Sequence, residues 1–340
     1  MSHEINNTDV FAEVRYNGQR AWHGLGTGLP QEVTTAREAF EFTGLDWDTV
    51  KKPVFYTDEN GERLAVPGQF AHIRQGTGEL LGMVAERYKP LQNAQLADFA
   101  DAVSLAGDGA ARIETCGSLR SGKTVYALME LDKSIDVNGD VTKPYIMVSN
   151  GHGATSGLRA YFTGIRVVCA NTEAMSLADL GTGVSFAHTG DLDGKVAAAK
   201  MILGRANDTV AAFEREAQFL ADHMWSLKEM EEGLRVVWEA VHSEALRGAK
   251  TSVVGRAKLE QQCDEDVRRW IELASAEGNS VRGTQGTAFA ALQGVTYDFD
   301  HAPAARRRLG PDARINSRLF GTASRQKSRA RAKVLQLVGA

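Results

Sequence analysis

The sequence predicts an α+β protein in which an antiparallel sheet comes first and helices follow it. Before residue 170, short apolar runs alternate with clusters of Gly, Asp and Asn, as in strands joined by turns. After residue 190, apolar residues recur every three or four positions, which is typical of helices. We therefore expect a mainly β region over residues 1–190 and a helical region over residues 191–340, which could together form one integrated domain.

The expected sheet region starts with three strands, and a helix separates them from four more. Leu96 and Phe99 belong to an apolar pattern of helical spacing, so this helix should span Leu91–Leu105. In the last strand apolar residues alternate with Arg159 and Tyr161, so one face should be apolar and the other basic and aromatic. The expected strands are Pro53–Tyr56, Phe70–Ile73, Leu80–Val84, Ala111–Cys116, Thr124–Leu131, Tyr145–Ser149 and Leu158–Cys169.

Four helices should follow the sheet region. A heptad stripe of apolar residues runs over Val196–Met224. The next helix should begin at Ser226, which forms a capping-box pattern with Glu229. We expect these two helices to form an antiparallel helical hairpin, and we expect two further helices over Arg256–Ala276 and Thr322–Leu337.

Composition indicates a folded, soluble protein of the cytoplasm. Hydrophobic residues make up 43% of the chain and charged residues 24%, as in ordinary globular proteins. The N-terminus lacks the basic start and apolar run of a secretory signal, and no apolar stretch reaches the ~18 residues of a membrane span. The three cysteines are far apart, which argues against a disulfide framework or a zinc site and suits a reducing compartment.

Charge is unevenly distributed along the chain. The formal net charge of −4 hides a basic C-terminal segment, residues 301–340, in which ten bases face a single acid, Asp312. Most are arginines, whose planar fork is well shaped to bind phosphate. This separation suggests either a polyanion partner, most commonly nucleic acid, or a contact with an acidic surface of the same chain. The ten bases are Arg306, Arg307, Arg308, Arg314, Arg318, Arg325, Lys327, Arg329, Arg331 and Lys333.

Gly117–Thr124 matches the phosphate-loop pattern GxxxxGK[ST], which would indicate a nucleotide-dependent enzyme. That chemistry needs a buried strand before the loop and a helix after it, so that backbone N–H groups and the helix dipole face the phosphates. Here residues 125–131 suit a strand at least as well as a helix. We expect a Gly-rich hairpin turn and keep an ATPase as the alternative, since a strand after Thr124 favours the turn and a helix favours the enzyme.

Other groups of reactive side chains have simpler explanations. Cys169 and His152 have the chemistry of a nucleophile and a base, but a Cys that ends an apolar run is usually a small buried hydrophobe. Asp298, Asp300 and His301 have the chemistry of metal ligands, but without a fourth partner they more often form a solvated turn. We expect no catalytic residue, no metal and no cofactor.

Four motifs, which begin at Trp22, Gly117, Arg166 and Tyr297, together resemble a known family, the phage and plasmid proteins grouped as domain of unknown function 932. The resemblance covers nearly the whole chain and implies a mobile element in a bacterial host cell, but it carries no established activity. The expected strand–strand–strand–helix core between residues 111 and 180 is also similar to that of single-strand annealing recombinases, which is a fold-level analogy. The motifs are Trp22-His23-Gly24-Leu25-Gly26, Gly117–Thr124, Arg166-Val167-Val168-Cys169-Ala170-Asn171-Thr172 and the turn Tyr297-Asp298-Phe299-Asp300-His301.

The hypothesis is therefore a single-stranded DNA-binding protein of a phage or plasmid that acts without catalysis in recombination or replication and, in its fuller form, anneals strands. Annealing proteins commonly form rings or filaments, so a homo-oligomer is expected. The alternatives are the ATPase and a structural or regulatory protein whose basic segment contacts its own acidic surface. The residues expected to bind phosphates or bases are Arg112, Arg120, Lys123, Arg159, Tyr161, Arg166, Arg306, Arg307, Arg308, Arg314 and Arg318.

Overall fold

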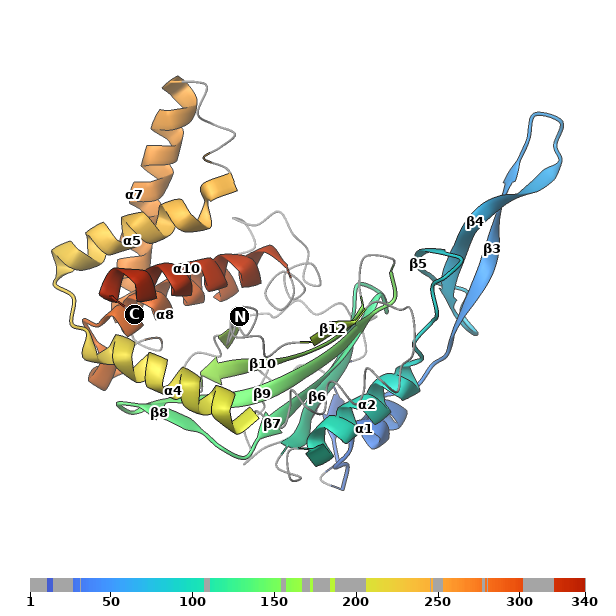
Figure 1. Ribbon diagram of the computed structural model, residues 1–340, viewed down its shortest axis with the longest axis horizontal. Coiled ribbons are helices and arrows are strands. Elements are labelled where there is room, and N and C mark those ends of the chain that lie inside the picture. The colour runs from blue at the N-terminus through green and yellow to red at the C-terminus, as the bar shows by residue number, and fades with distance from the viewer. Residues whose placement is uncertain are drawn as a thin grey trace. The chain divides into compact units, whose positions relative to one another are not determined.

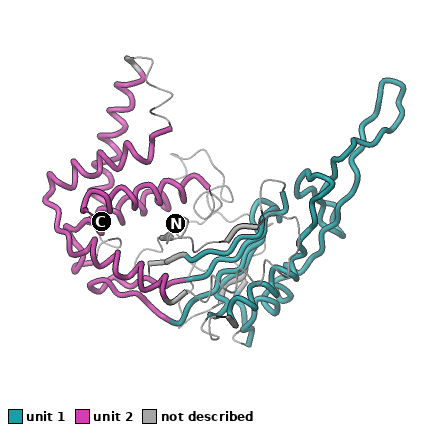
Figure 2. Tube along the Cα trace, viewed as in Figure 1, with its two compact units in different colours: residues 1–132, 145–162, 177–207 teal, residues 133–144, 163–176, 208–340 magenta. Residues whose placement is uncertain are grey.

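In the computed structural model the chain forms two compact units (Figure 2). Unit 1 comprises residues 1–132, 145–162 and 177–207, and unit 2 comprises residues 133–144, 163–176 and 208–340. The predicted α+β class, with antiparallel sheets followed by helices, is confirmed. The structure describes residues 11–14, 27–30, 32–106, 111–153, 157–166, 172–173, 184–186, 206–244, 246, 253–276, 279, 281–301 and 321–339.

The main sheet of unit 1 has the strand order β10-β9-β7-β6-β1-β2, with β12 beside β10. The β1–β6, β6–β7 and β7–β9 pairs are antiparallel, whereas β1 and β2 are parallel. Side chains on both faces of β6, β7 and β9 are buried, so these strands form the core of the unit. The strands are β1 Phe11–Val14, β2 Thr27–Leu29, β6 Ala111–Leu119, β7 Thr124–Leu131, β9 Asp140–Gly151, β10 Leu158–Arg166 and β12 Val184–Phe186.

Two helices, α1 (Ala36–Thr43) and α2 (Asn93–Ala106), pack against each other and against β6 (Figure 1). The prediction of a helix at α2 is confirmed, whereas α1 was not predicted. It is short, and its ends are held by local hydrogen bonds: Thr35 and Glu38 form a capping box, and Gly44 ends the helix in a left-handed conformation.

Unit 1 also contains a three-stranded sheet of order β3-β4-β5. Its strands are β3 (Thr49–Thr57), β4 (Arg63–Arg74) and β5 (Leu80–Ala85). Because β5 pairs only with the last part of β4, the other ends of β3 and β4 continue as a two-stranded ribbon. We call residues 49–74 the arm, and Figure 1 shows it extending away from α1 and α2.

Unit 2 is built around α8, which is buried along almost its whole length. Helices α7 and α10 pack against α8, and α5 packs against both of them. The capping box of Ser226 and Glu229 at the start of α5 is confirmed. The elements are β8 Ile135–Val137, β11 Thr172–Glu173, α4 Ala206–Asp222, α5 Leu227–Val241, α7 Val253–Ser275, α8 Ala288–His301 and α10 Thr322–Val338.

Two expectations about the helical region are wrong. Helix α5 packs mainly against α7 and α10 and does not form the expected antiparallel hairpin with α4, because an apolar stripe shows which face is buried but not what covers it. The segment ending Asp298-Phe299-Asp300-His301 is the last turn of α8 and not a solvated turn. Among the residues that the structure describes, no helix has the length and apolar character to cross a membrane.

Candidate nucleic-acid interface

The phosphate-loop pattern lies in the turn of a β-hairpin. Leu119 at the end of β6 pairs with Thr124 at the start of β7. Between them, Arg120, Ser121 and Gly122 have φ angles of 58°, 55° and 77°, which are left-handed conformations that suit a tight turn. A strand follows Thr124 where a nucleotide-binding loop needs a helix. The prediction of a hairpin turn is confirmed, and the backbone here does not form the cradle that an ATPase requires.

This turn is fixed against the base of the arm. Gly122 packs on the indole of Trp47, and a Cβ atom at this position would come within 3.2 Å of the ring. The carbonyl of Lys123 accepts a hydrogen bond of 2.9 Å from the backbone N–H of His152. The guanidinium of Arg74, at the end of β4, lies over the Trp47 ring, 4.7 Å from its centroid. The β6–β7 turn, the loop after β9 and the base of the arm therefore meet at one end of the main sheet.

Four cations gather at this end of the sheet. Arg120 and Lys123 are exposed on the turn, and Arg74 is partly exposed at the base of the arm. Arg159 is the second residue of β10, directly after the loop that follows β9, and it is also partly exposed. We call Arg74, Arg120, Lys123 and Arg159 the cationic end of the sheet. Like charges in one place create a local positive potential that attracts anions.

The remaining predicted residues do not join this group in the described part of the chain. Arg112 lies near the opposite end of β6, about 25 Å along the strand from Arg120, and its guanidinium is 4.0 Å from Asp132. Tyr161 shares a strand face with Arg159, but its ring is half-buried, and burial raises the pKa of its hydroxyl. The side chains outside the described residues are Arg166, Arg306, Arg307, Arg308, Arg314 and Arg318.

A layer of buried polar groups joins the arm to the main sheet beneath these cations. His72 of β4 hydrogen-bonds through Nδ1 to the carbonyl of His152, at 2.8 Å, and Nε2 of His152 lies 3.1 Å from Oδ1 of Asn93. All three side chains are fully buried. If Nδ1 of His72 carries the proton, its Nε2 is an acceptor, and it has no hydrogen-bond partner among the described residues. Burial lowers the pKa of His72, which favours its neutral imidazole, and the hydrogen bonds of this layer fix the arm to the main sheet.

In unit 2, a buried charge network joins α7, α8 and α10. Lys327 of α10 donates to Asp300 at 2.8 Å, and the two side chains are 3% and 1% exposed. Arg269 donates to both oxygens of Asp298, at 2.8 and 2.7 Å, and the indole N–H of Trp270 donates to the same carboxylate at 3.0 Å. Because these acids are held by bases within the fold, their role here is structural.

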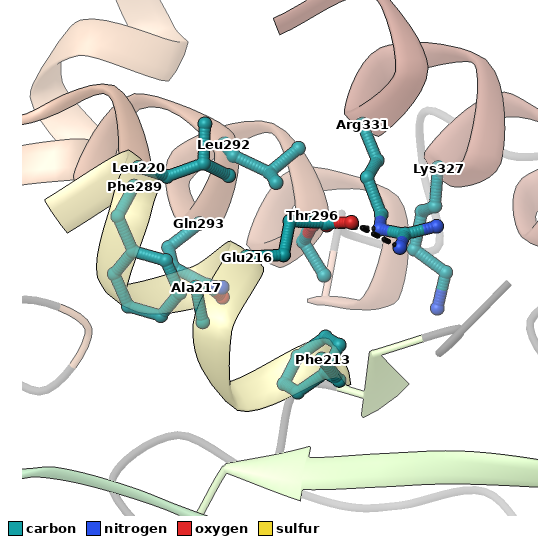
Figure 3. A pocket seen from close by; sticks show the side chains of 10 residues that line it. All are labelled: Phe213, Glu216, Ala217, Leu220, Phe289, Leu292, Gln293, Thr296, Lys327 and Arg331. Atoms are coloured by element: carbon teal, nitrogen blue, oxygen red, sulfur yellow. Dashed lines mark hydrogen bonds and ion pairs between the residues drawn. The ribbon is translucent and has the colours of Figure 1, made fainter. Parts of the chain in front are cut away.

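Two more bases of the C-terminal segment also contact acids of unit 2. Arg331 donates to both oxygens of Glu216, at 2.5 and 2.6 Å, as Figure 3 shows. Arg329 donates to Glu244 at 2.7 Å. The cavity beside Glu216 and Arg331 has a volume of about 20 Å³, which holds about one water molecule and no substrate. The internal explanation of the charge separation therefore applies to Lys327, Arg329 and Arg331.

Comparison with protein families gives one match. A family model described as Domain of unknown function (DUF932) matches residues 80–331. The chain belongs to this family. The match confirms the DUF932 resemblance over residues 80–331, which include three of the four motifs, whereas Trp22–Gly26 lies before it. It begins at the first residue of β5, so β3 and β4 of the arm also precede it. Searches of curated proteins and of solved structures gave no match.

The sequence prediction missed Arg74, which belongs to the cationic end, and Trp47, whose ring it covers. Neither belongs to a charge run or to a motif, and they meet only because the end of β4 pairs with the start of β3, two residues after Trp47. The available signal was weak: β3 and β4 carry several lysines, arginines and aromatic residues, but these follow no regular alternation.

Proposed function

We propose that the protein binds single-stranded DNA through the cationic end of the sheet and the basic C-terminal segment, and that it anneals complementary strands in the recombination or replication of a phage or plasmid. The observation that carries the proposal is the meeting of Arg74, Arg120, Lys123 and Arg159 from three separate segments of the chain. A bound polyanion relieves the repulsion between these four cations. Contacts with phosphates do not depend on the nucleotide sequence, so this site would bind any sequence.

The basic C-terminal segment adds charge to the same function. Whereas three bases of α10 are held by acids, Arg306–Arg308, Arg314 and Arg318 have one acid among them, Asp312. An annealing protein needs no catalytic group and no cofactor, because it holds the phosphates and leaves the bases free to pair. Rings or filaments of identical chains would extend this surface along the DNA, so we propose a homo-oligomer.

The test is the affinity for a fluorescent oligodeoxynucleotide of about 30 nucleotides, longer than the ~4–16 nucleotides of one common site. Fluorescence anisotropy is measured between about 50 and 200 mM salt, with a duplex of the same sequence beside it. We expect binding that prefers the single strand and weakens steeply with salt. Absence of binding at the lowest salt would refute the proposal, and nucleotide binding at Lys123 would be measured next.

A pair of variants tests the site itself. The double substitution Arg120→Gln and Lys123→Gln should weaken binding. The slope of log affinity against log salt concentration should become shallower by about 1.4, since each lost phosphate contact accounts for about 0.7 of that slope on a single strand. Arg112→Gln is the matched control, because Arg112 is an exposed base at the other end of β6 and should leave the slope unchanged. Equal effects of both variants would mean that the cationic end is not the site.

A further inference from the structure

The arm and Trp47 beside it carry three pairs of a basic side chain and an aromatic ring. The guanidinium of Arg74 lies over Trp47, 4.7 Å from the ring centroid. The ammonium of Lys51 lies 4.5 Å from the centroid of Phe70. The guanidinium of Arg63 lies 4.2 Å from the centroid of Phe55. These pairs follow one another from the base of the arm towards its tip.

The Lys51–Phe70 pair lies in the three-stranded part of the arm and the Arg63–Phe55 pair in the two-stranded part, and the register of β3 and β4 shifts between them, between Pro53 and Phe55. Both pairs lie on the same side of β3. Alternate residues of a strand share a face, so Lys51, Pro53, Phe55 and Thr57 lie on the same side of β3. Directly paired residues of neighbouring strands also share a face. Pro53 pairs with Phe70, and Thr57 pairs with Arg63. We call this side of the arm the ring face.

The opposite face has a different character. Lys52 and Tyr56 occupy the intervening positions of β3, and both side chains are exposed. On the same side, Lys52 pairs with Ala71, which pairs in turn with Met83 of β5. No base–aromatic pair is found on this side among the described residues. The two faces therefore offer a test and its control within the same short strand.

The ring face is accessible where it is farthest from the main sheet. Phe55 is 41% exposed and Arg63 is exposed beside it. Nearer the base, Lys51 is held in place, since its ammonium donates to the carbonyls of Glu86 and Tyr88, at 2.5 and 3.2 Å. The Lys51–Phe70 pair is thus ordered before any ligand arrives, which reduces the conformational entropy lost on binding.

We propose that the ring face of the arm binds single-stranded DNA by stacking unpaired bases on Phe55 and its neighbouring rings while Arg63 and Lys51 contact the phosphates. This inference rests on the proposed function and extends the cationic end of the sheet along the arm, since Arg74 belongs to both. Aromatic rings beside Lys and Arg side chains suit single-stranded DNA, because every nucleobase has a face that can stack once the nucleobase is unpaired. Duplex DNA hides those faces.

Charge at the tip sets the limit of this surface. The turn between β3 and β4 carries the acids Asp58, Glu59 and Glu62, which repel phosphate. The strand should therefore follow the shaft of the arm from its base (Figure 1) and end before the turn. Glu59→Gln should leave binding unchanged or strengthen it slightly.

The experiment compares neighbouring residues on opposite faces, with a fluorescent oligodeoxythymidylate of about 30 nucleotides and full-length protein. Phe55→Ala should weaken binding about 5- to 140-fold, since loss of a stacking residue costs about 1–3 kcal/mol per base. Tyr56, on the other side, is 52% exposed, and Tyr56→Ala should bind as the unchanged protein does. Arg63→Gln and Lys52→Gln form the second pair, and only the first should weaken binding.

The outcomes separate this inference from the proposed function. If the unchanged protein does not bind the oligonucleotide, the proposed function fails and this inference falls with it. If the unchanged protein binds but Phe55→Ala and Tyr56→Ala behave alike, only the ring face is refuted, and its pairs serve to stiffen the ribbon. Competition by duplex DNA as effective as that by the single strand would also refute stacking on the ring face.

Discussion

Lys327 and Lys123 carry the same ammonium group in opposite surroundings. Lys327 is 3% exposed and is bonded to Asp300, whereas Lys123 is exposed on the β6–β7 turn. Removing one partner of a buried ion pair destabilises a protein by about 3–5 kcal/mol, whereas an exposed base contributes about 1 kcal/mol or less to stability. Exposure therefore separates the bases of this chain into those that hold the fold and those that remain available for a polyanion.

At the residue scale, His72 predicts an effect of pH on stability. Burial lowers its pKa below the ordinary value of 6.5, so the unfolded state binds a proton more readily than the folded state. Stability should be highest above pH 6.5 and fall as the pH drops below it, by at most about 1.4 kcal/mol per pH unit for one such group.

Urea unfolding between pH 5 and 8 measures this dependence. His72→Asn keeps a donor near the position of Nδ1 and cannot titrate, so its curve should be flatter, with a remaining slope from His242, whose pKa burial also lowers. A variant curve as steep as that of the unchanged protein would exclude His72 as a source of acid sensitivity.

At the element scale, the β6–β7 hairpin shows how a short motif depends on its setting. The letters of Gly117–Thr124 satisfy a phosphate-binding pattern, yet strands on both sides make the segment a turn. Gly122 has a φ of 77° and lies against Trp47. Glycine suits this position because it adopts the left-handed conformation easily and has no Cβ atom to crowd the ring. The turn positions Arg120 and Lys123 and also supports the base of the arm.

Gly122→Ala tests that dual role. We expect a loss of about 1 kcal/mol from the left-handed conformation and a further loss from crowding at the Trp47 ring, 3.2 Å from the new Cβ atom. Gly44→Ala is the matched control, because Gly44 has a φ of 65° and open space around the Cβ position. Chemical unfolding of both variants measures the difference, and equal losses would show that the contact with Trp47 carries no energy.

At the scale of the whole molecule, the basic C-terminal segment has two parts: α10, whose bases contact acids of unit 2, and the residues before it, to which the proposed function assigns DNA binding. Helix α10 is built into unit 2, since Ala323, Lys327, Ala330 and Val334 are buried. In the sequence between His301 and α10, Asp312 is the one acid among five bases, Arg306, Arg307, Arg308, Arg314 and Arg318. Deleting the entire segment would therefore disturb folding and DNA binding together.

This division predicts different results for deletion and for neutralisation. Removal of residues 321–340 leaves the Asp300 carboxylate buried without the Lys327 ammonium, so unit 2 should lose at least about 3 kcal/mol of stability. Replacement of Arg306–Arg308 by Gln should leave the melting temperature unchanged and weaken binding to single-stranded DNA. Calorimetry and anisotropy on both variants measure this, and a melting temperature lowered equally by the two changes would contradict the division.

The sequence by itself determined the α+β class, most strands and helices, and the hairpin at Gly117–Thr124, because these depend on the local spacing of apolar residues and on turn-forming residues. It did not show that Asp298 and Asp300 end a buried helix, because charged residues are buried only where distant partners such as Arg269 and Lys327 meet them. Only the tertiary structure decided which bases lie together. Arg74 joined Lys123 and Arg112 did not, since strand pairing brings together residues that are far apart in the chain and separates the two ends of a single strand.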